Sequence, residues 1–272
     1  MSNKTFRNTL AADFKRSLRL PMLLAVLAVI IGFIFDNYND LKLLAFEQGR
    51  ENLSVFYYHS NSVSFGGMFS TYLFALIAAL PFATEYAAER QSDMALYLVS
   101  RSGVKNYGIS KMLTAAIAGG LALCLGSMIF VAVLSTQIQL VRPSDLVEHA
   151  GLPYYSLLAS GDGIQYFFAA WYLLFLTGAL WASAAMCVSA FAQDRYVVIA
   201  SPFLLCFLMV QFERLLRIPN AVRLDMLLIG HALWGSEIVS LLLAGTVIAL
   251  LVAGLTFAFC RHMKGVIQNG LC

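Results

Sequence analysis

The chain has 272 residues, of which 60% are hydrophobic and only 12% are charged. A soluble domain of this length carries roughly a quarter charged residues, and here the charges gather in clusters between long apolar stretches, which is typical of a chain dissolved in lipid. A net charge of +3 is too small to suggest nucleic-acid binding, and polar segments this short argue against a soluble-type active site.

Residues 1–20 are predicted to form an amphipathic helix that lies in the headgroup region of a membrane. Its apolar stripe recurs every four residues and comprises Phe6, Leu10, Phe14 and Leu18. The basic residues off this stripe are Arg7, Lys15 and Arg19. The alternative, a soluble extension of the first span, is disfavoured by Pro21 at the junction. We expect no cleavable signal sequence, because no small-residue cleavage site follows the first apolar run.

Six charge-free stretches are long enough, or nearly so, to cross a hydrocarbon core of about 30 Å. They comprise residues 20–35, 65–84, 112–135, 166–193, 196–212 and 238–260. Backbone groups at that depth must bond within their own segment, so each stretch is predicted to be a helix. The runs do not alternate as membrane-barrel strands do. The predicted fold class is all-α, with residues 1–272 forming a single transmembrane domain of six spans.

The lysines and arginines between the spans indicate an orientation. About twice as many lie on the side of the two termini as on the other side, which places both termini in the cytoplasm. The exception is the segment with Arg214, Arg217 and Arg223, which falls on the outside. We therefore expect a multi-pass protein of a bacterial plasma membrane.

Two outer connections, residues 36–64 and 136–162, are long and carry aromatic side chains. The second is predicted to contain a short helix on the outer membrane surface, followed by a glycine-rich return. By contrast, only residues 193–195 join the fourth and fifth spans, which predicts an antiparallel helical hairpin.

The connection between the second and third spans, residues 84–113, carries the most information. Glu85, Glu89 and Asp93 follow one another at four-residue spacing, so they are predicted to line one helical face, with Arg90 beside them. The apolar residues 94–99 come next, then Ser-Arg-Ser-Gly, and a new helix is predicted to begin near residues 104–107. Lys105 and Lys111 are expected near the membrane surface. The alternative is a solvated loop with the positive charges that any membrane protein carries.

This order of residues resembles the coupling region of type 2 ABC exporter permeases, which commonly read E-x-x-x-G-T-L-x-x-L-x-S-x-P-x-S-R and then G-K. Residues 89–93 stand where the family often has Glu-Arg-Glu-x-Gly, residues 94–99 stand for the leucine-rich piece, and residues 100–103 stand for the Ser-x-Pro turn. Ser110-Lys111 takes the place of Gly-Lys. The family's Gly and Pro are absent. The motif covers about thirty residues, whereas the predicted architecture resembles the family over most of the chain.

The resemblance implies a permease subunit that acts as two copies or as a pair of related subunits. A separate cytoplasmic ABC ATPase would bind ATP and press on the coupling region, and this chain itself has no Gly-x4-Gly-Lys-Ser/Thr phosphate loop. The contact surface expected for that ATPase comprises Glu85, Glu89, Arg90, Met94, Leu98 and Arg101. The expected cargo is amphipathic: a peptide, a drug or a lipid-like molecule.

Other functions find less support in the residues. His59, His149 and His231 fall in predicted outer segments, no His-Glu-x-x-His occurs, and no pair of the five cysteines has metal-ligand spacing. We therefore predict no catalytic, cofactor-binding or metal-ligating residue, and no enzymatic activity in this chain. A passive or secondary transporter is the stronger alternative, although the predicted spans lack the mid-membrane charges that ion coupling usually needs. A non-enzymatic sensing or structural subunit also stays open.

Overall fold

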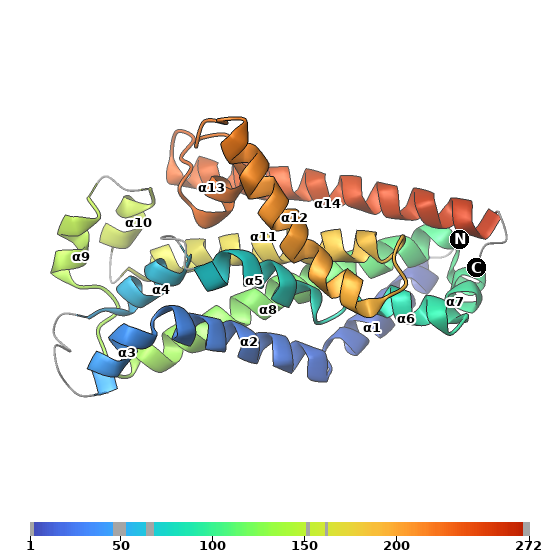
Figure 1. The fold of residues 1–272 in the computed structure, drawn as a ribbon, viewed down its shortest axis with the longest axis horizontal. Coiled ribbons are helices and arrows are strands. Elements are labelled where there is room, and N and C mark those ends of the chain that lie inside the picture. Colours follow the sequence, from blue (N-terminus) through green and yellow to red (C-terminus); the bar gives the residue numbers. More distant parts are fainter. Residues whose placement is uncertain (1–2, 46–52, 64–67, 151–152, 161–162, 269–272) are drawn as a thin grey trace.

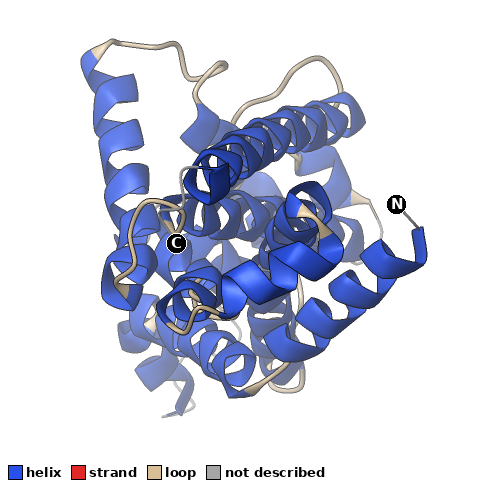
Figure 2. Ribbon diagram, turned by 90° about the vertical axis from the view of Figure 1, so that its right-hand side faces the viewer, coloured by secondary structure: helices blue, strands red, loops and turns tan. Residues whose placement is uncertain are grey.

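The computed structural model describes residues 3–45, 53–63, 68–150, 153–160 and 163–268. All regular structure within these ranges is helical, which confirms the all-α fold class (Figures 1 and 2). The helices are α1 (Asn3–Ser17), α2 (Leu20–Asp36), α3 (Tyr38–Ala45), α4 (Val55–Val63), α5 (Met68–Ala79), α6 (Glu85–Gln91), α7 (Met94–Ser102), α8 (Val104–Ser135), α9 (Pro143–Glu148), α10 (Tyr155–Ala159), α11 (Ile164–Val188), α12 (Arg195–Leu215), α13 (Leu224–Ile229) and α14 (Glu237–Gln268).

Several helices are long and apolar enough to cross a membrane. Within the described residues, α8, α11, α12 and α14 meet this condition singly. The pair α1 and α2 meets it together, although the two helices are bent by 53° at the break between them. The chain therefore has four or five candidate spans, consistent with a multi-pass membrane protein. α2 begins and ends within one residue of the predicted first span, and α8 begins at Val104, as predicted.

The second predicted span, residues 65–84, is not one continuous helix. α5 has 12 residues, and at 1.5 Å per residue it is about 18 Å long, well short of the roughly 30 Å hydrocarbon core. The helix ends before Pro81, which has no N–H to donate and disfavours helical geometry in the residue before it. The chain then turns through residues 80–84 into α6. Because of this break, six single-helix spans are not found in the described part of the chain.

The first helix, α1, ends before Pro21 as the sequence predicted, but its buried face is rotated from the predicted stripe. Asp13 and Ser17 are buried, whereas Leu18 is 55% exposed. α1 packs against α8, so this face contacts protein rather than lipid. Its placement in a headgroup region stays a prediction.

The centre of the bundle is the contact between α8 and α11. Gly119 of α8 and Gly178 of α11 face each other so closely that a Cβ on Gly119 would lie 2.7 Å from the carbonyl oxygen of Gly178. Small residues allow membrane helices to approach in this way. The α8–α11 pair therefore forms the frame on which the shorter helices pack.

The start of α1 and the end of α14 lie at the same end of the long bundle, together with α7, while α3, α9 and α10 lie at the opposite end (Figure 1). We call these the α7 end and the α9 end. The predicted single outer helix is two short helices, α9 and α10, and α11 and α12 form the predicted hairpin. Which end faces the cytoplasm stays a prediction.

Candidate functional site

The helix α7 stands between two sharp changes of backbone direction. Asp93, before it, has φ 56°, and Gly103, after it, has φ 81°. Glycine enters this left-handed region without a steric penalty, and Asp does so more readily than most residues. Since α6 ends at Gln91, Asp93 lies outside that helix, and the predicted acidic face ends at Glu89. Where the sequence predicted an apolar turn after the first helix, the structure thus has a distinct short helix, joined to α8 by one glycine.

α7 has one buried and one exposed face. Its buried residues, Ala95, Val99 and Ser102, face the bundle. Ala95 and Val99 join an apolar cluster that also contains Tyr86, Tyr107, Met112, Phe259 and Met263. On the other face, Met94 is 48% and Tyr97 is 66% exposed, and Arg101 is exposed one turn further on. We call Met94, Tyr97 and Arg101 the outer face of α7.

Four charged side chains meet behind α7. Lys111 of α8 is completely buried, and its Nζ lies 2.9 Å from Oδ1 of Asp13 and 2.7 Å from Oε1 of Glu89. Arg16 of α1 places its Nη1 2.8 Å from the same Glu89 oxygen. Two cations and two anions balance, so this ion cluster of Asp13, Arg16, Glu89 and Lys111 is neutral as a whole.

The remaining carboxylate oxygens of the ion cluster are also satisfied. Ser110 donates to Oδ2 of Asp13 at 2.6 Å, and the hydroxyl of Tyr107 donates to Oε2 of Glu89. The rings of Phe82 and Tyr107 lie 5.1 and 5.3 Å from the Lys111 Nζ, within cation–π range. A buried charge is tolerated only with this degree of pairing. The cluster therefore holds α1, α6 and α8 in one arrangement.

A second set of contacts joins α6 to the turn between α11 and α12. Arg90 donates from Nη1 to the carbonyl oxygen of Ala190 at 3.0 Å. Gln91 donates to the carbonyl oxygen of Gln193 at 2.8 Å. α6 is thus connected on one side to the ion cluster and on the other to the α11–α12 hairpin.

The six residues predicted to contact an ATPase have different surroundings. Met94 and Arg101 lie together on the outer face of α7, whereas Leu98 is partly buried against the apolar cluster. Glu89 is 5% exposed and belongs to the ion cluster, Arg90 bonds the α11–α12 turn, and Glu85 is half-buried. Of the six, only Met94 and Arg101 are thus exposed on the same surface.

Three residues that the geometry makes prominent were not among the predicted contact residues. Tyr97 completes the outer face of α7, and its position three residues after Met94 and four before Arg101 is the signal for it. Asp13 lies on the apolar side of an amphipathic helix, where an isolated acid needs a partner. Lys111 was expected near the membrane surface at the start of the third span, and nothing local to it indicates complete burial.

Among the described residues, no group of three or more His, Cys, Asp or Glu side chains is placed to hold a metal ion. Comparison with known proteins adds no assignment: no family model, curated protein or solved structure matches this chain. The ion cluster and the outer face of α7 are therefore the features of the described residues that bear most directly on function.

Proposed function

We propose that this chain is the membrane-spanning permease subunit of an ATP-driven ABC exporter, and that a separate cytoplasmic ATPase subunit docks on the outer face of α7. The observation that carries the proposal is the pairing of an exposed, partly apolar face with a rigid interior behind it. Met94 and Tyr97 are large, exposed side chains on a short helix that is not one of the candidate spans, and a protein partner would cover them.

The contacts of α7 provide a route from that face into the spans. A force on α7 acts through Val99 on the apolar cluster, which includes Tyr107 of α8 and Phe259 of α14. The ion cluster then joins α8 to α1 and α6. A packed core and paired charges move as a body rather than deform. Docking of an ATPase could in this way shift several spans together.

The poorly covered helices support a second permease copy or a related permease. In the most apolar 18-residue stretches of α12 and α14, only 28% and 17% of the residues are buried inside the protein, against 72% in α11. Lipid and a partner subunit are the two surroundings that apolar faces of this kind accept. The proposal includes an amphipathic cargo, ATP bound only in the partner ATPase, no catalysis in this chain, and a bacterial plasma membrane with the α7 end in the cytoplasm.

The proposal is tested by reconstituting the chain with a candidate ATPase from the same cell and measuring ATP hydrolysis. In the variant Met94→Asp/Tyr97→Asp, the stimulation of ATP hydrolysis by this chain is expected to fall about tenfold or more, because the variant places two charges on the docking face. Leu98 is left intact, since its partial burial would confuse docking with folding.

A matched control is Val147→Asp, which changes a residue 79% exposed on α9 at the opposite end. It is expected to keep full stimulation. All three proteins should reach the membrane in equal amounts. Undiminished stimulation by Met94→Asp/Tyr97→Asp would sink the docking assignment, and failure of every ATPase of the cell to bind the wild-type chain would sink the permease assignment.

One observation favours a second candidate, a secondary transporter. His59 of α4 is completely buried, and its Nε2 lies 3.1 Å from the hydroxyl oxygen of Ser127 in α8. A titratable group inside the bundle is a feature of proton-coupled carriers. Proton uptake into liposomes that contain only this chain, abolished by His59→Gln, would support that candidate against the first.

A further inference from the structure

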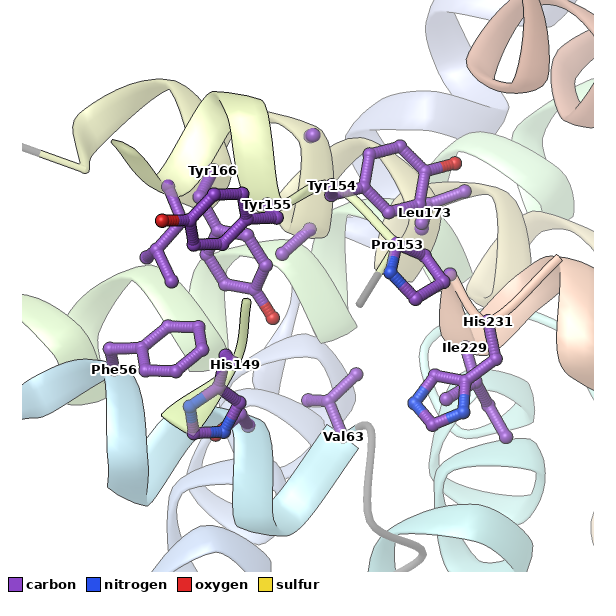
Figure 3. A pocket seen from close by; sticks show the side chains of 15 residues that line it. Phe56, Val63, His149, Pro153, Tyr154, Tyr155, Tyr166, Leu173, Ile229 and His231 are labelled. Atoms are coloured by element: carbon purple, nitrogen blue, oxygen red, sulfur yellow. The ribbon is translucent and has the colours of Figure 1, made fainter. Parts of the chain in front are cut away.

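The α9 end encloses a hollow that the proposed function does not use. It has a volume of about 660 Å³, part of it open to solvent, and lies between α4, α10, α11 and α13. Its wall is rich in rings, among them Phe56, His149, Tyr154, Tyr155, Tyr166 and His231. In the view of Figure 3, the side chain of Val63 lies between His149 and His231. We call this space the outer hollow.

A second hollow, of about 500 Å³, adjoins the first. It lies among α5, α11, α12 and α13, and its wall includes Phe74, Thr177, Trp181 and Val210. Val63 and Ile229 belong to the walls of both spaces, so the two meet at these side chains. α11 and α12, which line this inner hollow, are both candidate spans.

The walls of the two hollows differ in polarity. Among the described residues that line the outer hollow, none is Asp, Glu, Lys or Arg, and its polar groups are imidazoles, phenols and the hydroxyl of Ser60. The inner hollow is mostly apolar. Its carboxylate, Asp225, is paired with Arg223 through contacts of 2.5 and 3.0 Å. A charged ligand would therefore lose its hydration without meeting a free counter-charge.

The wall of the outer hollow has the strained, unsatisfied character of a binding site. Tyr154 is 4% exposed and has φ 62°, an uncommon conformation for a bulky residue. Its hydroxyl has no hydrogen-bond partner among the described residues. Gly230 has φ 83°, and a Cβ there would lie 3.2 Å from Cε2 of Tyr154. The tyrosine ring is thus held against a glycine while its buried hydroxyl still needs a partner.

We infer that the two hollows form one binding site for a single-chain amphiphile with an uncharged, hydrogen-bonding head group. The head lies among the rings of the outer hollow, and the chain passes Val63 and Ile229 into the inner hollow. The inference specifies the cargo class of the proposed exporter, and its role in transport rests on that proposal, whereas binding itself does not.

The test uses tryptophan fluorescence, because Trp181 lines the inner hollow. The chain has three tryptophans, so Trp171→Phe/Trp234→Phe leaves Trp181 alone. The purified chain, in nanodiscs and without any ATPase, is titrated with a monoacylglycerol that carries bromine on its acyl chain. Contact with bromine quenches the indole. We expect saturable quenching at low mole fraction, reversed by the unbrominated monoacylglycerol.

Two variants and one control locate the site. Val63→Phe is expected to weaken binding about tenfold by closing the junction between the hollows, and Tyr154→Phe about two- to tenfold through loss of one hydroxyl. Leu250→Phe, at a residue of α14 that is 73% exposed, is expected to change nothing. A protein with Trp171 alone, which is outside both walls, should show only the gradual quenching caused by bromine dissolved in the bilayer.

Three results would overturn the inference: quenching that never saturates, equal saturable quenching of Trp171, or unchanged affinity in Val63→Phe. Bromo-alkyl carboxylate or bromo-alkylammonium probes that bind as well as the monoacylglycerol would overturn the uncharged head group. Since no ATPase takes part, loss of ATPase docking with retained quenching would contradict only the proposed function. Retained ATPase docking with no saturable quenching would contradict only the binding site.

Discussion

Polar groups are buried in different ways at the two ends of the bundle. At the α7 end, Lys111 is completely buried, and both carboxylates beside it are fully bonded. At the α9 end, polar groups sit on aromatic rings around a hollow, and the hydroxyl of Tyr154 is left without a partner among the described residues. Paired charges fix one geometry, whereas rings around a space leave room for a ligand.

This difference separates two tasks that one membrane domain can combine. A neutral, saturated ion cluster couples helices rigidly, because any relative movement breaks several short contacts at once. An aromatic hollow with unused hydrogen-bonding capacity accepts a molecule without breaking existing bonds. In the functions proposed above, the α7 end would transmit force and the α9 end would bind a ligand.

The largest expected effect tests the rigidity of the α7 end. Lys111→Met leaves Asp13 and Glu89 with only Arg16 to balance them, and breaking a buried pair in this way costs about 3–5 kcal/mol. We expect a large drop in the thermal unfolding midpoint of the detergent-solubilised protein. Lys105→Met, at an exposed position six residues away, should leave the midpoint nearly unchanged. Equal unfolding midpoints for the two variants would show that the ion cluster contributes nothing to thermal stability.

The second effect tests the contact that joins the two ends. Gly119→Ala would place its Cβ against Ala182 and 2.7 Å from the carbonyl oxygen of Ala78, and overpacking of this kind costs about 1–3 kcal/mol. The control Gly254→Ala on α14 meets nothing within 4 Å. Thermal unfolding should separate the variants, with Gly119→Ala less stable. If both match the wild type, the α8–α11 contact is looser than described.

The smallest effect concerns pH at the α9 end. Partial burial lowers the pKa of His231 from its ordinary value, with Asp225 acting in the opposite direction. The folded state then favours the neutral imidazole, so its stability is complete above about pH 6.5 and declines as the pH falls through that value towards the lower folded pKa. The wild type should lose more thermal stability between pH 7.5 and 5.5 than His231→Gln. Parallel losses would contradict this assignment.

Much of the secondary structure was predictable from local patterns. The all-α class, the positions of α2, α8, α11, α12 and α14, and the start of α8 after Gly103 follow from hydropathy, helix breakers and the need of a backbone in lipid to bond to itself. The second span was predicted wrongly as one helix, because hydropathy continues through residues 80–84 while Pro81 interrupts the hydrogen bonds.

The sequence by itself therefore determined that this is a helical, multi-pass chain, whereas the short helix α7 appears where only a turn was predicted. Only the tertiary structure decided which polar residues meet: Asp13 and Lys111 are 98 positions apart, and His59, expected in an outer segment, is buried beside Ser127. Helix formation depends on neighbours within four residues. The pairing of buried charges and the walls of a hollow depend on how distant helices pack, and no local pattern records that.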